Sequence, residues 1–160
     1  MKTITKHPDF HTGLEEVDLQ HAFFIDLIER LTPALENSHD LTRQVRLLEE
    51  VQLFAAFHFH SEENLYMEHG LDENHLAHHQ KRHGELLGAL NHYIFQLQQG
   101  QESVESILLV LGDWFSYHAV EEDGFAVDRI VAQKQSESQQ VQSAMQVLEL
   151  KCFESEDPFG

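Results

Sequence analysis

The chain has 160 residues, of which 41% are hydrophobic, and a formal net charge of −18 at pH 7. That length fits one domain with its own core, and the acidic balance excludes nucleic acid and anionic membrane surfaces, because both bind basic patches. No apolar run reaches the roughly 20 residues of a membrane span, and the N-terminal segment lacks the apolar stretch of a signal peptide. A single cysteine, Cys152, allows no internal disulfide, so we expect a cytoplasmic protein.

Hydrophobic residues recur with helical periodicity through nearly the whole chain. The pattern predicts a first helix over about residues 19–37, in which Pro33 marks a kink or an early end. A second helix is expected over about 41–68, a third over about 75–99 and a fourth over about 104–129. Short connections between four such helices predict an all-α fold, an antiparallel up-and-down four-helix bundle.

The C-terminal stretch begins with polar residues and continues with apolar ones. Four of its residues have heptad-like spacing: Val141, Met145, Leu148 and Cys152. We therefore expect an additional C-terminal helix, or an extension of the fourth, with an acidic end. We divide the chain into a bundle over 1–132 and a tail over 133–160. The tail either packs on its own bundle or forms a seam with a second subunit or a downstream domain.

Histidine is unusually frequent, with 13 residues, and four of them fall in the stretch HLAHHQKRH. At 100° per residue, His79 and His83 each lie about 20° from the centre of the apolar stripe of the third helix. His75 lies about 60° from that centre and His78 about 120°. His79 and His83 are therefore expected to point into the bundle, His75 is marginal, and His78 faces solvent.

The other three helices repeat this pattern. On the second helix His58 shares an apolar face with Glu62, whereas Glu63 points about 140° away, towards solvent. His21 on the first helix and His118 on the fourth also lie on apolar faces. A lone histidine in such a position is usually a satisfied core residue. Five on four helices, together with a buried carboxylate, indicate a metal centre inside the bundle.

The donor set limits which metal is bound. Nitrogen and oxygen donors suit iron, manganese or zinc, and the lack of a thiolate disfavours iron–sulfur clusters and cuprous copper. Five imidazoles with carboxylates exceed the four ligands of a structural zinc site, so two ions with bridging carboxylates account for the set better. A ferritin-like centre needs two Glu-x-x-His pairs on core helices, and this chain has only Glu36 with His39, at a helix end.

Four segments follow one another along the chain: FHTGLEEVDLQH, HFHSEENLYMEHG, HQKRH and WFSYHAVEED. Together they resemble the bacterial hemerythrins, over about residues 10–123. The first is similar to the segment before that family's first ligand histidine. The others resemble its HFxxEExxM segment, its HxxxH pair, and its WxxxH segment with an aspartate five residues on. The family's Gly-Tyr-Pro is here Gly70-Leu71-Asp72, and the longer spacing after it leaves His75 with His79 as an alternative pair.

The resemblance implies reversible dioxygen binding by two iron ions per chain, joined by an oxo or hydroxo bridge. The metal ligands that it implies are His21, His58, Glu62, His79, His83, His118 and Asp123. Residues one turn from these ligands would form an apolar wall around the bound oxygen: Ile25, Phe54, Leu86 and Trp114. The protein would then be an oxygen or redox sensor domain, including one of a larger signalling protein, or an oxygen carrier. The alternatives are a di-iron peroxidase or oxidase, an iron-handling protein, and a zinc-loaded structural bundle.

Helical geometry alone does not select Asp123. On a regular α-helix it lies about 140° from His118, whereas Glu122 lies about 40° away. A π-type turn brings positions i and i+5 onto one face. We therefore predict such a distortion between His118 and Asp123, and a regular helix with Glu122 at the centre would rule out this assignment.

Overall fold

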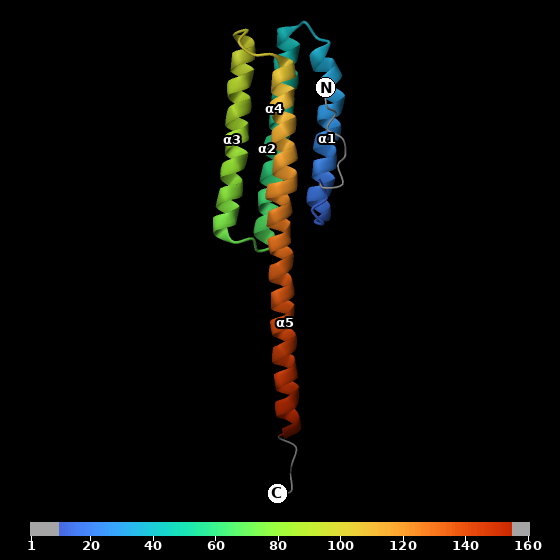
Figure 1. Cartoon of the computed structure of the whole chain (residues 1–160), viewed down its shortest axis with the longest axis vertical. Coiled ribbons are helices and arrows are strands. Elements are labelled where there is room, and N and C mark those ends of the chain that lie inside the picture. The colour runs from blue at the N-terminus through green and yellow to red at the C-terminus, as the bar shows by residue number, and fades with distance from the viewer. Residues whose placement is uncertain (1–9, 155–160) are drawn as a thin grey trace.

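The structure is a computed structural model that describes residues 10–154. It contains α1 (Glu15–Glu36), α2 (Leu41–Glu68), α3 (Glu73–Gln98), α4 (Val104–Tyr117), the π-helix η2 (His118–Asp123) and α5 (Gly124–Glu154). Helices α1 to α4 run up and down side by side, and α5 continues the line of α4 beyond the end of the bundle (Figure 1). The predicted all-α antiparallel four-helix bundle is confirmed, and the additional C-terminal helix is an extension of the fourth.

Local signals explain where most of the helices begin and end. Asp40 caps α2 by accepting from the backbone N–H of Thr42 at 3.0 Å, and Ser103 caps α4 in the same way. Gly70 and Gly100 follow α2 and α3 with positive φ angles of 82° and 69°, a conformation that a side chain would strain. These caps and stops keep the connections short and the neighbouring helices antiparallel.

Two helices differ from the prediction. The N-terminus of α1 lies at Glu15, before the expected residue 19, because the carboxylate of Asp18 reaches back to the backbone N–H of Thr12 at 2.6 Å. Pro33 lies inside α1 and does not end it. The N-terminus of α3 lies at Glu73 rather than 75, because Asp72 accepts from the backbone N–H of His75 at 3.1 Å.

The apolar core consists of two clusters. The larger one contains residues of all four helices α1, α2, α3 and α4. The smaller one contains residues from the beginning of α1, the end of α2 and the beginning of α5. On α1, His21 lies between Val17 of the smaller cluster and Phe24 of the larger one; on α2, Glu62 precedes Tyr66 of the smaller cluster. The polar candidate residues therefore occupy a layer with apolar packing on both sides.

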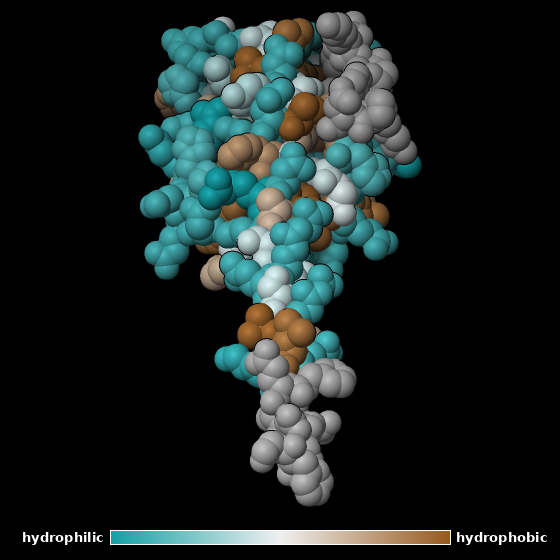
Figure 2. All heavy atoms as spheres, turned by 60° about the horizontal axis from the view of Figure 1, so that its bottom comes forward, coloured by the Kyte–Doolittle hydropathy of each residue, from teal (hydrophilic) through white to brown (hydrophobic). Residues whose placement is uncertain are grey.

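Beyond the bundle, α5 has no packing partner among the described residues. Ile130 is its last buried residue, and every residue from Lys134 to Lys151 is exposed. Apolar side chains gather near its far end, next to the grey atoms in Figure 2. Lys134 contacts His69 of the bundle at 2.9 Å, and the described part of the tail beyond it does not pack on its own bundle. The predicted units 1–132 and 133–160 include residues 1–9 and 155–160, which lie outside the described residues. None of the described helices combines the length and apolarity of a membrane span.

Candidate metal centre

Seven ionisable side chains meet in the layer between the two apolar clusters, and each of them is at most 4% exposed. They are His21 on α1, His58 and Glu62 on α2, His79 and His83 on α3, and His118 and Asp123 on η2. All seven residues predicted as metal ligands thus come together, from all four helical lines of the bundle. Their role as ligands stays a prediction.

The π-helix decides which carboxylate enters the centre. The distortion predicted between His118 and Asp123 is confirmed, because these six residues form η2. Asp123 Oδ1 lies 3.2 Å from the inward atom Nε2 of His118, whereas Glu122 pairs with Nδ1 on the outer side of the same ring. The extra residue per turn therefore places Asp123 inside and Glu122 outside, and the alternative with Glu122 at the centre is wrong.

His75 does not belong to the centre. Its Nδ1 lies 2.7 Å from Asp72 Oδ1 at the beginning of α3, and its side chain is 36% exposed. His79 and His83 are both buried within the layer. The helical wheel therefore predicted correctly that His79 and His83 point into the bundle, and the alternative pair of His75 with His79 does not fit the geometry.

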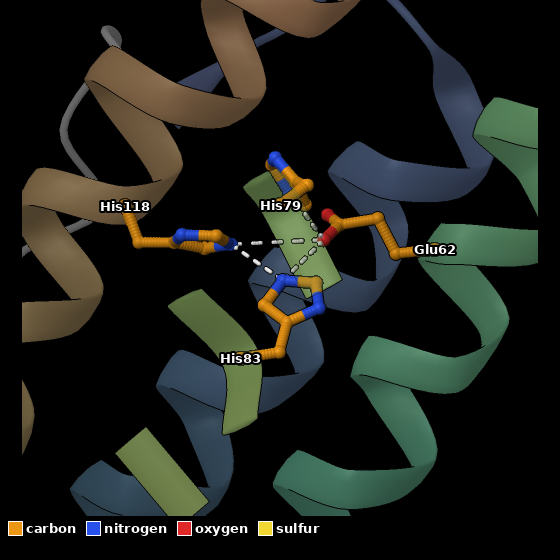
Figure 3. A group of neighbouring side chains, drawn as sticks. All are labelled: Glu62, His79, His83 and His118. Carbon is orange, nitrogen blue, oxygen red and sulfur yellow. Dashed lines mark hydrogen bonds and ion pairs between the residues drawn. The ribbon is translucent and has the colours of Figure 1, made fainter. Parts of the chain in front are cut away.

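Glu62 divides its two oxygens between two groups of histidines. Oε2 lies 3.2 Å from Nε2 of both His79 and His83 and 3.7 Å from Nε2 of His118. These three residues form the three-histidine group, and Figure 3 shows their rings converging on the carboxylate. Oε1 lies 3.6 Å from Nε2 of His21 and 3.8 Å from Nε2 of His58, which form the two-histidine group.

Asp123 divides its oxygens in the same way. Oδ1 lies 2.8 Å from His79 and 3.2 Å from His118, both in the three-histidine group. Oδ2 lies 2.9 Å from His21, in the two-histidine group. Each carboxylate thus presents one oxygen to each group. This is the arrangement that two metal ions sharing bridging carboxylates require.

Several atoms that point into the centre are buried without a hydrogen-bond partner. They indicate whether the seven side chains fit metal ions. They are Nε2 of His21 and His58, Oε1 of Glu62, and both carboxylate oxygens of Asp123. An unsatisfied buried polar group costs about 1–3 kcal/mol. Nε2 of His83 and Nε2 of His118, two atoms of the same kind, face each other at 2.9 Å. Cations among these nitrogen and oxygen donors would satisfy all of them, so the residues fit iron or another divalent metal.

Without a bound metal, the negative charges of the centre favour protonation of some of its histidines. Burial opposes the charge of His21 and His79, but the nearby carboxylates of Asp123 and Glu62 raise the pKa of His21 to about 10 and that of His79 to about 9. Burial lowers the pKa of His58 to about 4, so this ring is neutral. Although burial also opposes the charge of both carboxylates, the neighbouring histidines hold the pKa values of Glu62 and Asp123 below their usual range. Metal ions must therefore displace protons from His21 and His79.

The candidate wall residues belong to the larger cluster or pack against it. Ile25 and Leu86 are each 2% exposed, and Phe54 and Trp114 are partly buried against the cluster. The ring of Trp114 stacks on that of His118, with centroids 4.4 Å apart. Phe54 stacks on Phe24 rather than on a histidine. Their function as the wall of an oxygen pocket stays a prediction.

Four other residues lie near the centre, and helical faces pointed to only one of them, Glu122, about 40° from His118. Gln20, Glu63 and Glu122 contact the outer nitrogens of the histidines, and Glu63 is not turned to solvent as expected. Tyr66 is fully buried, and burial, with the charges of Glu62 and Asp123, raises its pKa well above the usual range. For the other three the only signal in the sequence was position: Gln20 and Glu63 directly adjoin predicted ligands, and Tyr66 follows Glu62 by four residues.

A helical bundle whose core holds five histidines and two carboxylates defines a class of cation-binding protein. The chain matches the family model described as "Hemerythrin HHE cation binding domain" over residues 12–126, and it belongs to this family.

Two similar relatives are the bacteriohemerythrins of Pseudomonas aeruginosa strains LESB58 and UCBPP-PA14. Each is 24% identical over 122 residues, which cover 76% of this chain and 78% of the relative. Among solved structures, a crystal structure of a leucine-to-phenylalanine mutant aligns with a TM-score of 0.66 and 21% identity, over 76% of this chain and 92% of that chain. The fold is therefore shared with that protein.

Proposed function

We propose that this protein binds dioxygen reversibly at a non-haem di-iron centre, as an oxygen or redox sensor domain or as an oxygen carrier. One observation carries the proposal: Glu62 and Asp123 each present one oxygen to the three-histidine group and the other to the two-histidine group. Membership of a cation-binding family supports a metal centre at this place. We also propose a cytoplasmic location, because the single cysteine fits a reducing compartment.

In this proposal the three-histidine group would hold one iron ion and the two-histidine group the other. Glu62 and Asp123 would contribute to holding both ions, because each presents one oxygen to each group. The iron pair, when bound, would supply the electrons that reversible oxygen binding needs. The two-histidine group offers one side-chain ligand fewer, so it would leave room for the oxygen molecule.

The side chains around the two-histidine group keep water away from it. The ring of Phe115 meets that of His21 edge-on, with centroids 5.5 Å apart, and Phe24 stacks on His58 at 6.2 Å. Ile25, one turn from His21, is 2% exposed. A dry apolar surrounding of this kind protects a bound oxygen molecule from the protons that would release it in reduced form.

The test is the absorption spectrum of the iron-loaded protein through one oxygen cycle. The reduced protein should contain about two iron ions per chain and should gain an absorption band under oxygen. That band should disappear when oxygen is removed. Irreversible oxidation in a single exposure, or zinc alone in protein produced with ample iron, would contradict the proposal.

A second candidate, a di-iron peroxidase or oxidase, is favoured by a surface cavity of about 490 Å³ between α3, η2 and α5. His79 of the centre and Glu122 form part of its lining, together with His75, His78 and Phe125. A small electron donor could approach the centre through this cavity. Steady consumption of peroxide that depends on an added reductant would support this candidate, and its absence would favour oxygen binding alone.

A sensor also needs a surface that transmits its signal to a partner. We assign this role to the projecting part of α5, residues 134–151. Val141, Met145 and Leu148 have heptad-like spacing and are 58%, 57% and 63% exposed. Residues 131–151 contain two lysines and two glutamates, so this segment has no formal net charge, whereas the whole chain carries −18. We propose that a second copy of the chain covers this face, because identical heptads pair with each other and the neutral segment avoids repulsion.

A further inference from the structure

The histidines of the centre are held from outside by two different kinds of partner. In the three-histidine group, Nδ1 of His83 lies 2.7 Å from Glu63 Oε1, and Nδ1 of His118 pairs with Glu122. Both carboxylates are mostly buried, with side chains 18% and 12% exposed. Two of the three rings in this group therefore donate to a negatively charged acceptor.

Arg82 fixes one of these carboxylates from the far side. Its Nε donates to Glu122 at 2.7 Å, and its Nη1 donates to Glu85 at 2.7 Å. The acceptor behind His118 is thus held in position by the guanidinium group of Arg82.

The two-histidine group has neutral partners instead. Nδ1 of His58 donates to the amide oxygen of Gln20 at 2.8 Å, and the amide nitrogen of Gln20 donates to Ser61 Oγ at 2.7 Å, which fixes the orientation of the amide. Nδ1 of His21 lies 3.5 Å from the backbone carbonyl oxygen of Phe10. No carboxylate contacts the outer nitrogen of either ring among the described residues.

An acceptor at Nδ1 fixes the tautomer and orientation of a metal-binding imidazole, and a carboxylate also raises its basicity. We propose that the three-histidine group is the tighter of the two metal positions and fills first, because Glu63 and Glu122 strengthen His83 and His118 as donors. The two-histidine group then fills second. This inference rests on the two-metal centre of the proposed function, but it concerns the order of metal binding and not oxygen chemistry. Glu63 and Glu122 are positioning residues in this proposal.

The test is a titration of the metal-free protein with Co²⁺, whose visible absorption reports its coordination. The wild-type protein should bind two ions in two resolved steps. The double variant Glu63→Gln, Glu122→Gln should weaken the first step by about 10–100-fold, the range typical of outer partners, and the second step much less. The variant Gln20→Glu should strengthen the second step alone.

Glu121→Gln is the matched control, because this residue is exposed, adjoins Glu122 and loses the same charge. It should change neither step, and circular dichroism of each variant reports whether the bundle is intact. A single cooperative step in the wild type, or equal weakening of both steps in the double variant, would overturn the proposal. Ordered Co²⁺ binding without reversible oxygen binding by the iron form would instead contradict only the proposed function.

Discussion

The middle of the bundle and the projecting part of α5 depart from ordinary burial in opposite directions. Seven ionisable side chains in the middle are at most 4% exposed, whereas five apolar side chains between residues 134 and 151 of α5 are at least 50% exposed. The five are Val141, Met145, Val147, Leu148 and Leu150. Buried charges need partners of opposite charge, and exposed apolar surface is stabilised when it is covered. Both regions therefore suit the partners proposed for them: metal ions for the first and a second copy of the chain for the second.

The largest effect is expected from Glu62→Gln. The neutral amide keeps the volume of the side chain but loses the charge that both histidine groups share. We expect the iron content to fall from two ions per chain to one or fewer, measured by elemental analysis after removal of loosely bound metal. Glu121→Gln, an exposed control, should retain two ions. Two ions in both variants would contradict a bridging role for Glu62.

Metal affinity should depend strongly on pH. Below its raised pKa, about 10 for His21 and about 9 for His79, each ring holds a proton that the metal must displace. Affinity should therefore rise from pH 7 to pH 9, by about 10-fold per pH unit for each proton released, as mass action requires. His58, already neutral with a pKa of about 4, should contribute nothing. Competition titrations with Zn²⁺ at three pH values check this, and a flat profile would contradict it.

Metal removal should destabilise the bundle and leave the projecting helix unaffected. A ligand at 100 times its dissociation constant stabilises the folded state by about 2.7 kcal/mol, which raises Tm by about 5–10 °C for each ion in a chain of this size. Thermal unfolding with and without a chelator measures the shift. A chain ending at residue 133 should show the same shift, because α5 beyond Lys134 does not contact the centre. An unchanged Tm would count against the centre.

A smaller effect is expected at the proposed seam. Leu148→Ser should weaken self-association by about 10–100-fold, because it removes apolar surface worth about 1.5–3 kcal/mol when fully buried. Leu150 is the matched control: it is similarly exposed, at 66%, but lies about 180° from Val141 around the helix. Analytical ultracentrifugation should show dimers for the wild type and for Leu150→Ser. A monomeric wild type, or equal loss in both variants, would show that a different partner covers this face.

Periodicity predicted most of the fold, because burial of one helical face leaves a clear pattern in the residues. It separated His79 and His83 from His75, and it placed His21, His58 and His118 on the core side. The end of α2 and the beginning of α4 lie where they were predicted. The beginning of α1 was missed because it depends on Asp18 reaching back to Thr12, a contact that apolar spacing does not record.

The rest of the site depends on contacts between helices. The inward position of Asp123 depends on the π-helix. The family resemblance implied Asp123 as a ligand, whereas a regular helical wheel excluded it, so we predicted the distortion that reconciles the two. Glu63 was expected in solvent, yet it reaches His83 on the neighbouring helix, because the wheel gives a direction but not the distance to another helix. The pairing of Gln20 on α1 with His58 on α2 was missed for the same reason.

The crystal structure of the iron-loaded protein, with anomalous diffraction recorded at the iron edge, tests the central claim most directly. The account predicts two iron peaks, one among His79, His83 and His118 and the other beside His21 and His58. Glu62 and Asp123 should lie between the two peaks, with one oxygen directed to each. A single peak, or two peaks without these carboxylates between them, would contradict it.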